Sequence, residues 1–438
     1  MVGGSGHHAE HGIASSEKQS WAFASVAPHG PFLASLAAVL YPPPVRYALV
    51  HYHELTLKKG NRAYFLQRLV KNLQRGLKGT GAGPIERPEG RLLVALPEAA
   101  DEGEIRARLA RTFGVANFAI ARWVPLDMDR LAEAVTDTVK PLRFASFRIS
   151  AKRGNKRYPL TSNQINVELG TLVGSLTGAR VDLERAELTI YVEVLEKGFL
   201  LSLDRLAGPG GLPAGISGRV ACLLSGGLDS PVAAYRMMKR GAHVIFVHFH
   251  SHPFVTRASQ EKARELVELL TRYQHASRLF LVPFGEVQRE VVLAVPPPLR
   301  VVVYRRLMIR IAEDIARRVH AQALITGEAL GQVASQTLAN MSTIDAAASL
   351  PVLRPLVGMD KEEIVHQAQA IGTYEISIQP DQDCCTLFTP KHPATKSTVG
   401  ELEAAEAKLN VQALIRMATD KAEEVRFVFP PTTSESVS

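Results

Sequence analysis

The segment Ser225-Gly226-Gly227-Leu228-Asp229-Ser230 has the residue types of a phosphate-binding loop. An apolar run at 220–224 precedes it and a helix-like run at 231–240 follows it, which predicts a strand, a tight polar loop and a helix. Glycines let a backbone approach a ligand closely, and the N–H groups at a helix start bind anions. The loop lacks the Gly-Lys-Ser/Thr ending of the Walker loop, so an ordinary ATPase or GTPase is disfavoured. We expect Asp229 to act beside a divalent cation or the phosphates; the alternative is a plain glycine-rich turn.

Two further polar clusters follow strands of the same expected sheet. From residue 219, strands are expected at 219–224, 243–249, 279–283 and 322–326, with helices at 230–240, 257–274 and 301–319. Such alternation predicts a parallel sheet wrapped by helices. Ligands bind at the carboxyl ends of the strands of such a sheet. We therefore expect the loop at 225–230, the residues 248–251 and the residues 326–328 to meet in one crevice.

The first half of the chain predicts two smaller α+β units. A ferredoxin-like unit at 45–125 has expected strands at 47–50, 91–96 and 117–124 and helices at 63–77 and 102–113. A second unit at 126–206 has expected helices at 129–140 and 162–176 and strands at 144–151, 188–195 and 199–204. Between its first strand and second helix we expect a loop suited to RNA phosphates and one stacked base, or else a plain charged loop. Its residues are Lys152, Arg153, Lys156, Arg157 and Tyr158.

Composition limits the class of protein. The chain has 438 residues, enough for two to four domains, and no apolar run long enough to span a membrane. Its three cysteines argue against a disulfide framework and for the cytoplasm. Residues 45–160 carry twice as many Lys and Arg as Asp and Glu, which favours a polyanionic partner over a generic basic surface. We expect a disordered extension at 1–44, a glycine- and proline-rich linker at 207–218, a nucleotide domain at 219–400, and a helix and tail at 401–438.

Several motifs together resemble the tRNA 4-thiouridine synthetase family, in its short form without a C-terminal rhodanese-like domain. In the first half they lie at 53–62, at 127–205, which looks like a THUMP RNA-binding domain, and at 210–218. The family's opening motif usually has Arg and Gly where this chain has His51 and His53. The resemblance covers about 47–400 in the family's domain order. In the second half its motifs are 223–230, 247–253 (VHFHSHP), Arg305-Arg306, 326–337, 355–361 and 383–396.

The resemblance implies a fold, a reaction and partners. The fold is ferredoxin-like and THUMP domains followed by a parallel-sheet pyrophosphate-loop domain of the adenine-nucleotide α-hydrolase-like type. With ATP and Mg²⁺, the enzyme would adenylate O4 of uridine-8 in tRNA and release pyrophosphate, and sulfur would then displace AMP to give 4-thiouridine. Backbone N–H groups of 225–230 would hold the departing pyrophosphate. The implied partners are tRNA and a cysteine desulfurase as sulfur donor. The resemblance also implies a side role in thiamine thiazole synthesis, with a ThiS-like sulfur carrier as partner. A homodimer would let one subunit bind RNA while the other reacts.

The resemblance also implies site residues, several of which have a structural alternative. Lys361 would assist at the phosphates; it follows Asp360, which forms a helix N-cap with Glu363, and a cation is unfavourable at a helix start. His248 could instead be a satisfied strand-end histidine, Arg305 a surface cation, and Gln336 a support for the loop backbone. No residue is assigned as a metal ligand. The implied ATP contacts are Leu223, Leu224, Ser225, Gly226, Gly227, Asp229, Ser230, His248, Phe249, Arg305, Gly327 and Gln336.

The cysteines supply the expected sulfur chemistry. Cys222 lies in an expected strand and is read as a buried small hydrophobe. Cys384 and Cys385 lie in a polar loop near Lys391 and Lys396, cations that favour the thiolate. The resemblance implies that Cys385 is catalytic, either carrying a persulfide or attacking one, with Cys384 as resolving thiol; the alternative is two inert cysteines. A non-catalytic tRNA-binding protein with a vestigial nucleotide site is the competing function, and the intact Asp229, Lys361 and Cys385 argue against it.

Overall fold

The computed structural model describes residues 46–431 except 58, 89, 381–389 and 391–392. The expected N-terminal extension at 1–44 lies outside the described residues, and so do Cys384 and Cys385. Within the described part of the chain, every helix is too short or too polar to cross a membrane.

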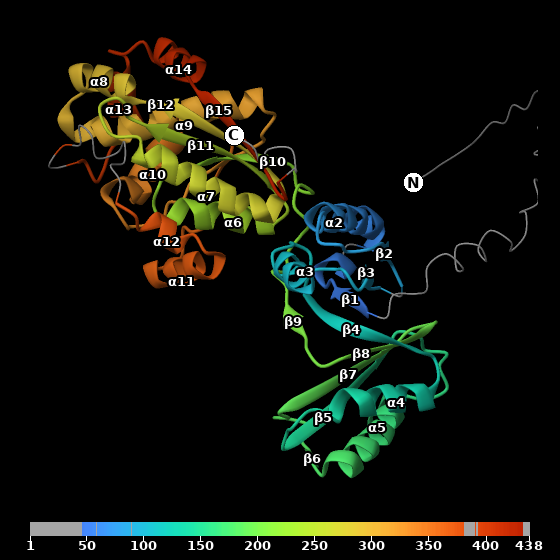
Figure 1. The fold of residues 1–438 in the computed structure, drawn as a ribbon. Coiled ribbons are helices and arrows are strands. Elements are labelled where there is room, and N and C mark those ends of the chain that lie inside the picture. Colours follow the sequence, from blue (N-terminus) through green and yellow to red (C-terminus); the bar gives the residue numbers. More distant parts are fainter. Residues whose placement is uncertain (1–45, 58, 89, 381–389, 391–392, 432–438) are drawn as a thin grey trace, which may run out of the picture. The chain divides into compact units, whose positions relative to one another are not determined.

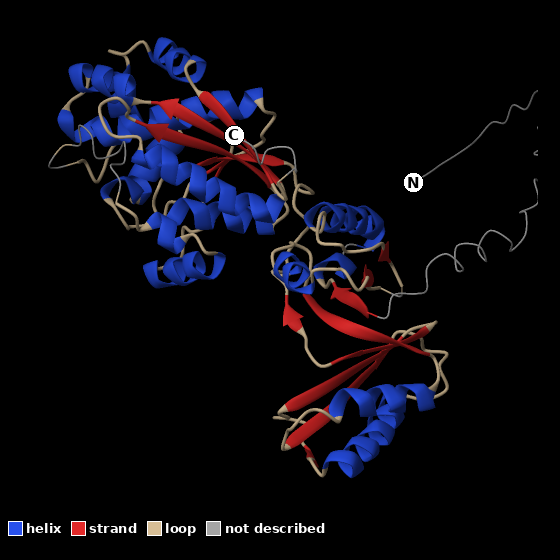
Figure 2. Cartoon of the chain, viewed as in Figure 1, coloured by secondary structure: helices blue, strands red, loops and turns tan. Residues whose placement is uncertain are grey.

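The first half folds around one nine-stranded sheet, with strand order β2-β3-β1-β4-β8-β7-β5-β6 and β9 paired to β4 (Figures 1 and 2). Antiparallel pairing of β4 with β8 joins the two expected α+β units into this continuous sheet. The elements of the first unit are β1 (Arg46–His51), η1 (Glu54–Leu57), η2 (Lys59–Asn61), α2 (Arg62–Gly76), β2 (Ile85–Glu86), β3 (Leu92–Leu96), α3 (Glu102–Leu109) and β4 (Asn117–Pro125).

The second unit has two helices and the remaining strands of this sheet. Local sequence signals set both ends of helix α5. Thr161 and Gln164 form a capping box at its start, and Gly178 ends it at a φ of +70°. Apolar residues of α4 and α5 pack with those of β5, β7 and β8 in one core. The elements are α4 (Met128–Val139), β5 (Ser146–Arg153), α5 (Ser162–Thr177), β6 (Arg180–Val181), β7 (Leu188–Val194), β8 (Gly198–Ser202) and β9 (Leu206–Ala207).

The second half contains a six-stranded sheet of order β14-β13-β10-β11-β12-β15. All neighbouring pairs are parallel except β12 with β15. The strands are β10 (Arg219–Leu223), β11 (His243–His250), β12 (Ala276–Pro283), β13 (Leu324–Ile325), β14 (Val352–Leu353) and β15 (Glu423–Val428).

Helices cover both faces of this sheet (Figure 2). Residues of α6, α7 and α11 pack with Cys222, Val244 and Phe246 on one face, and those of α8, α9 and α14 pack with Ala221, Ile245 and Val247 on the other. Side chains alternate between the two faces of a strand, which explains this division. The helices are α6 (Asp229–Lys239), α7 (Ala258–Gln274), α8 (Gly285–Ala294), η3 (Pro297–Leu299), α9 (Arg300–Arg318), η4 (Ala334–Gln336), α10 (Leu338–Asp345), α11 (Lys361–Ile371), α12 (Tyr374–Ser377), α13 (Val399–Glu406) and α14 (Val411–Asp420).

The structure corrects three sequence-based expectations. The sequence predicts one helix and a tail at 401–438, but residues 401–428 complete α13, form α14 and add β15 to the sheet, antiparallel to β12. The sheet is therefore mostly, not wholly, parallel. The expected loop at 152–159 begins later, because Lys152 and Arg153 pair with β7 at the end of β5.

A buried charge cluster joins β1, β3's flank and β7 in the first sheet. His51 Nε2 lies 2.8 Å from Glu193 Oε1, and Arg91 forms an ion pair with the other carboxylate oxygen. All three residues are buried. Burial opposes the charge of Glu193, but the contacts with His51 and Arg91 outweigh it and lower the pKa of that carboxyl to about 2.

We expect Glu193→Gln to destabilise this sheet in a pH-dependent way. A carboxyl whose pKa falls on folding adds stability above its unfolded pKa, and that stability is lost as pH falls through the folded pKa. A shift from 4.5 to about 2 corresponds to about 3 kcal/mol at pH 7 and less than half of that at pH 3. The loss of unfolding free energy is measured by urea unfolding at both pH values. The signal is Trp123 fluorescence in a Trp21→Phe background.

The matched control is Glu196→Gln, which changes an exposed glutamate three residues away on the same chain segment. We expect it to alter the unfolding free energy by less than about 0.5 kcal/mol at either pH. An equal loss of stability for Glu193→Gln at pH 7 and pH 3 would contradict the role of its charge.

Candidate active site

A pocket of about 180 Å³ opens at the carboxyl ends of β10, β11 and β13. The three polar clusters expected to converge do meet here. Of the expected nucleotide contacts, all except Gly226 and Gly227 line the pocket; Met308, Thr326 and Glu328 line it as well. Met308 lies one helical turn after Arg305 on α9, so that spacing is the only sequence signal that could have identified it. The shared lining residues are Leu223, Leu224, Ser225, Asp229, Ser230, His248, Phe249, Arg305, Gly327 and Gln336.

Two serines fold the loop at 225–230 back on itself. The Ser225 N–H donates to Ser230 Oγ at 2.8 Å, and Ser230 Oγ donates to the Ser225 carbonyl at 3.2 Å. The Gly227 N–H is 3.3 Å from Ser225 Oγ. The loop itself therefore uses two of the N–H groups expected to hold pyrophosphate. Those of Gly226 and Leu228 have no hydrogen-bond acceptor among the described residues.

The glycines near this loop differ in what the fold requires of them. A Cβ at Gly327 would lie 2.6 Å from the Ser230 backbone nitrogen, so only glycine lets β13's end pack against the start of α6. A Cβ at Gly227 would meet only Ser225 Oγ, at an ordinary 3.5 Å, and its φ is not positive. Packing within the chain therefore does not require glycine at 227.

An ion pair connects the loop to a helix 132 residues later in the chain. Lys361 Nζ donates to Asp229 Oδ1 at 2.8 Å, and Gln332 Nε2 donates to Asp229 Oδ2 at 3.2 Å. The expected capping box at the start of α11 is confirmed, since the Asp360 side chain accepts from the Glu363 N–H and the Glu363 side chain accepts in return. This cap places Lys361 at the first helical position, with its ammonium beside the loop.

His248 has the environment of a hydrogen-bonded histidine at a strand end, the alternative to a direct ATP contact. Its side chain is buried, with Nδ1 2.9 Å from the Leu224 carbonyl oxygen and Nε2 3.4 Å from Ser259 Oγ. A carbonyl only accepts, so Nδ1 is the donor in this contact. His248 thus fixes the strand end that leads into the loop, while its ring forms part of the pocket wall.

Gln336 lines the pocket with a buried oxygen that lacks a hydrogen-bond donor among the described residues. It is 7% exposed, and its Oε1 has no hydrogen-bond partner among the described residues. An orphaned buried acceptor costs free energy unless a ligand or water supplies a donor. Gln336 can therefore accept a hydrogen bond from a bound molecule. Arg305, half-buried on α9, lines the same pocket, which disfavours its reading as a plain surface cation.

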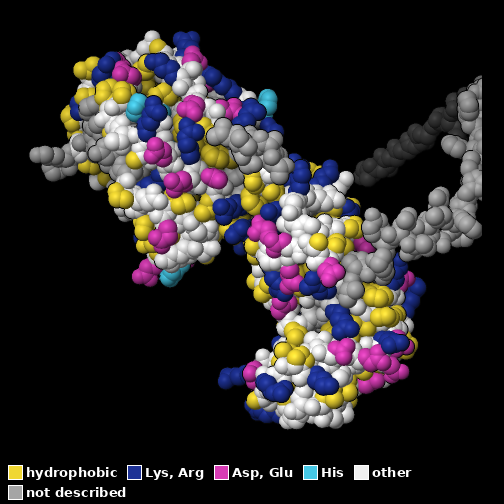
Figure 3. Space-filling view, viewed as in Figure 1, with side chains coloured by type: hydrophobic (Ala, Val, Ile, Leu, Met, Phe, Trp, Pro, Cys, Tyr) yellow, Lys and Arg dark blue, Asp and Glu magenta, His cyan; other side chains and the backbone are white. Residues whose placement is uncertain are grey.

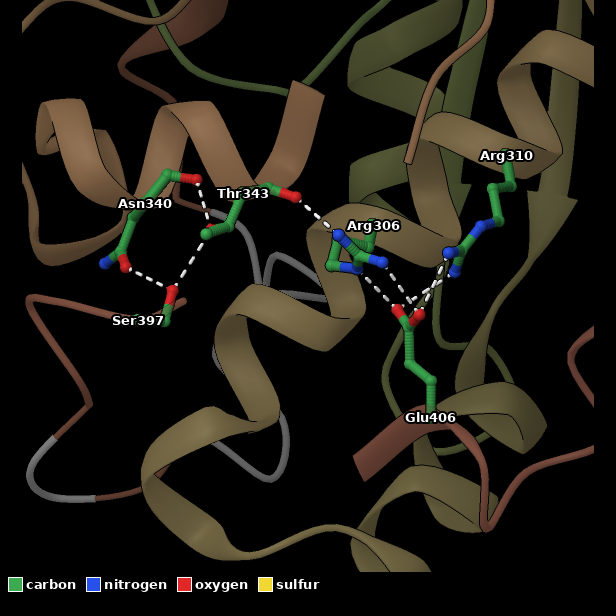
Figure 4. A network of polar contacts seen from close by, with 6 residues as sticks. All are labelled: Arg306, Arg310, Asn340, Thr343, Ser397 and Glu406. Carbon is green, nitrogen blue, oxygen red and sulfur yellow. Dashed lines mark hydrogen bonds and ion pairs between the residues drawn. The ribbon is translucent and has the colours of Figure 1, made fainter. Parts of the chain in front are cut away.

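Buried side chains hold this wall in place (Figure 4). Asn340 Nδ2 donates to the carbonyls of Ala334 and Ala394 at 2.8 and 2.9 Å, and Ser397 Oγ donates to Asn340 Oδ1 at 2.7 Å. Helix α10 therefore joins η4, which carries Gln336, to the segment that follows the two cysteines in sequence.

A second buried network supports α9, the helix that carries Arg305. Arg306 and Arg310 both bind the Glu406 carboxylate of α13, and Arg306 also donates to the Thr343 carbonyl of α10 (Figure 4). Burial opposes the charge of Glu406, but hydrogen bonds from the two arginines outweigh it and lower the pKa of its carboxyl. The satisfied cluster fixes α9, α10 and α13 relative to one another.

Cys222 and the expected RNA contacts are not among the residues that line this pocket. Cys222 is fully buried, and burial raises the pKa of its thiol to about 12. Both facts agree with the expectation that it packs as a small hydrophobic residue. Arg153 donates to the carbonyls of Tyr158 and Leu160, so it shapes its own loop. Tyr158 packs edge-on against Phe199 with ring centroids 5.4 Å apart and is partly buried, so stacking of this ring on a base stays a prediction.

Three of the four expected RNA-contacting cations, Lys152, Lys156 and Arg157, are exposed. In Figure 3, Lys and Arg side chains are spread over the visible face of this unit and are interspersed with Asp and Glu. The contact with RNA therefore stays a prediction that depends on these three side chains.

Comparison with known proteins gives the same domain order as the sequence. Three family models match in succession: the ThiI ferredoxin-like domain at residues 47–119, the THUMP domain at 126–204, and the thiamine biosynthesis protein (ThiI) at 215–411. Each match covers a region where the sequence analysis expected a corresponding unit.

Curated relatives match along most of their length. A probable tRNA sulfurtransferase of Thermus thermophilus is 50% identical, with 86% of this chain and 93% of the relative covered. One from Moorella thermoacetica is 42% identical, with 86% and 96% covered. A crystal structure of a 4-thiouridine synthetase–RNA complex with bound ATP is 37% identical, covers 87% of this chain and 100% of that one, and has a TM-score of 0.80. The chain therefore belongs to the ThiI family of tRNA sulfurtransferases.

Proposed function

We propose that this chain uses ATP to adenylate O4 of uridine-8 in tRNA and then replaces that oxygen with sulfur, giving 4-thiouridine. The observation that carries the proposal is the pocket at the ends of β10, β11 and β13. It is lined both by Asp229, the ion-pair partner of Lys361, and by Gln336, whose Oε1 has no hydrogen-bond partner among the described residues. The similar 4-thiouridine synthetase was crystallised with RNA and bound ATP, which supports the same pair of substrates here.

The described residues fit a nucleotide with its phosphates over the loop. The Gln336 carbonyl oxygen can accept a hydrogen bond from the exocyclic amino group of adenine. The N–H groups of Gly226 and Leu228, together with the start of α6, suit the phosphates. Glycine at 227, which packing does not require, allows a phosphate to come close.

In the first step uridine O4 attacks the α-phosphorus, the bond between the α-phosphorus and its bridging oxygen breaks, and pyrophosphate leaves. The uracil N3 proton is released to solvent as O4 becomes adenylated. Negative charge builds on that leaving group, and Lys361 with the loop N–H groups would stabilise it. Asp229 is the residue that would hold Mg²⁺, and the ion would offset the charge of the phosphates.

The second step belongs to the cysteines. The terminal sulfur of a Cys385 persulfide, loaded by a cysteine desulfurase, would attack C4 of the adenylated uridine and expel AMP. The Cys384 thiolate would then attack the Cys385 sulfur, so that 4-thiouridine leaves with its new sulfur and a Cys384–Cys385 disulfide remains. A dithiol reductant would return both thiols for the next cycle.

The same loading chemistry can serve a second acceptor. The family model that matches residues 215–411 is described as a thiamine biosynthesis protein. We therefore also propose that sulfur from Cys385 can pass to a ThiS-like sulfur carrier for thiazole synthesis. This route needs the cysteine but not the tRNA.

We expect Asp229→Asn and Lys361→Met each to slow 4-thiouridine formation by about 10²- to 10³-fold, because both act where charge develops in the adenylation step. Both side chains are partly exposed, so unfolding should change by less than about 1 kcal/mol. The measurement is near-UV absorbance of 4-thiouridine after incubation with unmodified tRNA, Mg-ATP, cysteine and a desulfurase.

The matched control is Glu362→Ala, an exposed neighbour of Lys361 on α11. It should keep the wild-type rate. If Lys361→Met is as active as Glu362→Ala, the ion pair has no part in the chemistry. If the wild type makes no 4-thiouridine while a known synthetase does so under the same conditions, the chain is a tRNA-binding protein with a vestigial nucleotide site.

We expect Cys385→Ser to separate the two steps. Pyrophosphate release in the presence of tRNA should persist, while 4-thiouridine formation should fall by at least about 10³-fold because the nucleophile is gone. Cys222→Ala is the control: this buried thiol does not line the pocket, and its only hydrogen bond in the described residues is a long one of 3.8 Å to the Ser230 carbonyl. Both rates should therefore stay close to those of the wild type. Equal sulfur transfer by Cys385→Ser and wild type would overturn the assignment of Cys385.

A further inference from the structure

A second pocket, of about 370 Å³, lies at the same edge of the sheet as the candidate active site. The ends of β11 and β12, the first turns of α7 and the start of β15 line it. Since β11 lies between β10 and β12, this second pocket is one strand further along the sheet (Figure 1). His248 lines the first pocket and His250 the second, and two residues of a strand span about 7 Å.

His250 indicates that the second pocket takes a ligand. The residue is 8% exposed and lines the pocket, yet its Nδ1 is buried with no hydrogen-bond partner among the described residues. Burial, helped by the charges of neighbouring histidines and Arg257, lowers the pKa of His250 to about 4. The ring is therefore neutral at pH 7, and with its one proton on Nδ1 it can donate a hydrogen bond to a phosphate oxygen.

The charge of the pocket matches a single negative group. Arg264 is paired with Glu423 at 2.8 Å. Arg257 and Lys421 also line the pocket, and neither has a hydrogen-bond or ion-pair partner among the described residues, so they face one remaining acid, Glu261. The two arginines and one lysine of the lining exceed its two glutamates by one positive charge.

Helix α7 adds to this potential. It begins at Ala258 after Arg257, and no side chain caps its first turn. The uncapped N–H groups and the dipole of a 17-residue helix favour an anion at this end. The helix start and the orphaned nitrogen of His250 are independent features that point to the same pocket.

We propose that this second pocket binds a backbone phosphate of the tRNA substrate, next to the uridine that enters the active site. The proposal rests on the proposed function, because it takes tRNA to be the substrate. A phosphodiester carries one negative charge and balances the pocket, whereas pyrophosphate carries more. An enzyme that extrudes a base must also hold the flanking backbone close to the reacting site.

The test compares two double variants of the full chain. Arg257→Ala/Lys421→Ala removes the two unpaired cations of the pocket. Lys408→Ala/Arg416→Ala removes two exposed cations elsewhere in the same domain and is the matched control. Binding of an unmodified tRNA transcript is measured by fluorescence anisotropy between 50 and 200 mM salt, and ATP and inorganic phosphate are titrated separately.

The plot of log K against log salt has a negative slope, and one lost phosphate contact makes it less steep by about 0.9. The factor by which affinity falls between 50 and 200 mM salt then becomes about threefold smaller. We expect that change for the pocket variant only, with ATP affinity and thermal unfolding as in the control. The same slope in both variants overturns the proposal. So does weaker binding of inorganic phosphate with an unchanged tRNA slope, which would mean a free-anion site. These are binding measurements, so they stand even if the wild type fails to make 4-thiouridine.

Discussion

The parallel pairing of β10 with β11 and β13 is the constraint on which the rest of the site depends. It aligns the carboxyl ends of three strands that are far apart in sequence, and each of these ends leads into polar residues. The close approach of Gly327 to the Ser230 nitrogen is possible only because β10 and β13 are neighbours. The second pocket follows from the same alignment, since β11 carries His248 to one pocket and His250 to the next.

Long-range side-chain contacts then place the chemistry on this edge. The ion pair of Asp229 with Lys361 joins the start of α6 to the start of α11. Asn340 joins the wall that carries Gln336 to the segment after the cysteines, and the Arg306–Glu406 pair fixes the helix beneath Arg305. Each contact connects a group proposed for adenylation to a segment that is distant from it in the sequence.

The sequence predicted the strand-loop-helix at 225–230, the domain order and the capping box at Lys361, because each has a strong local pattern. It did not predict β15, because the apolar alternation of this six-residue edge strand is limited to Val425 and Phe427, too short a pattern to identify a strand. Nor could it show that Ser225 and Ser230 bond to one another, that Tyr158 packs on Phe199, or that His250 Nδ1 has no hydrogen-bond partner among the described residues. Those facts depend on which side chains meet in three dimensions.

The central claim is that uridine O4 becomes an oxygen of AMP, and isotope labelling measures this directly. A tRNA carrying ¹⁸O at O4 of uridine-8 would be incubated with the protein, Mg-ATP, cysteine and a desulfurase, and the released nucleotide analysed by mass spectrometry. The account predicts one ¹⁸O in AMP for each 4-thiouridine formed. Unlabelled AMP, or ADP in its place, would contradict it.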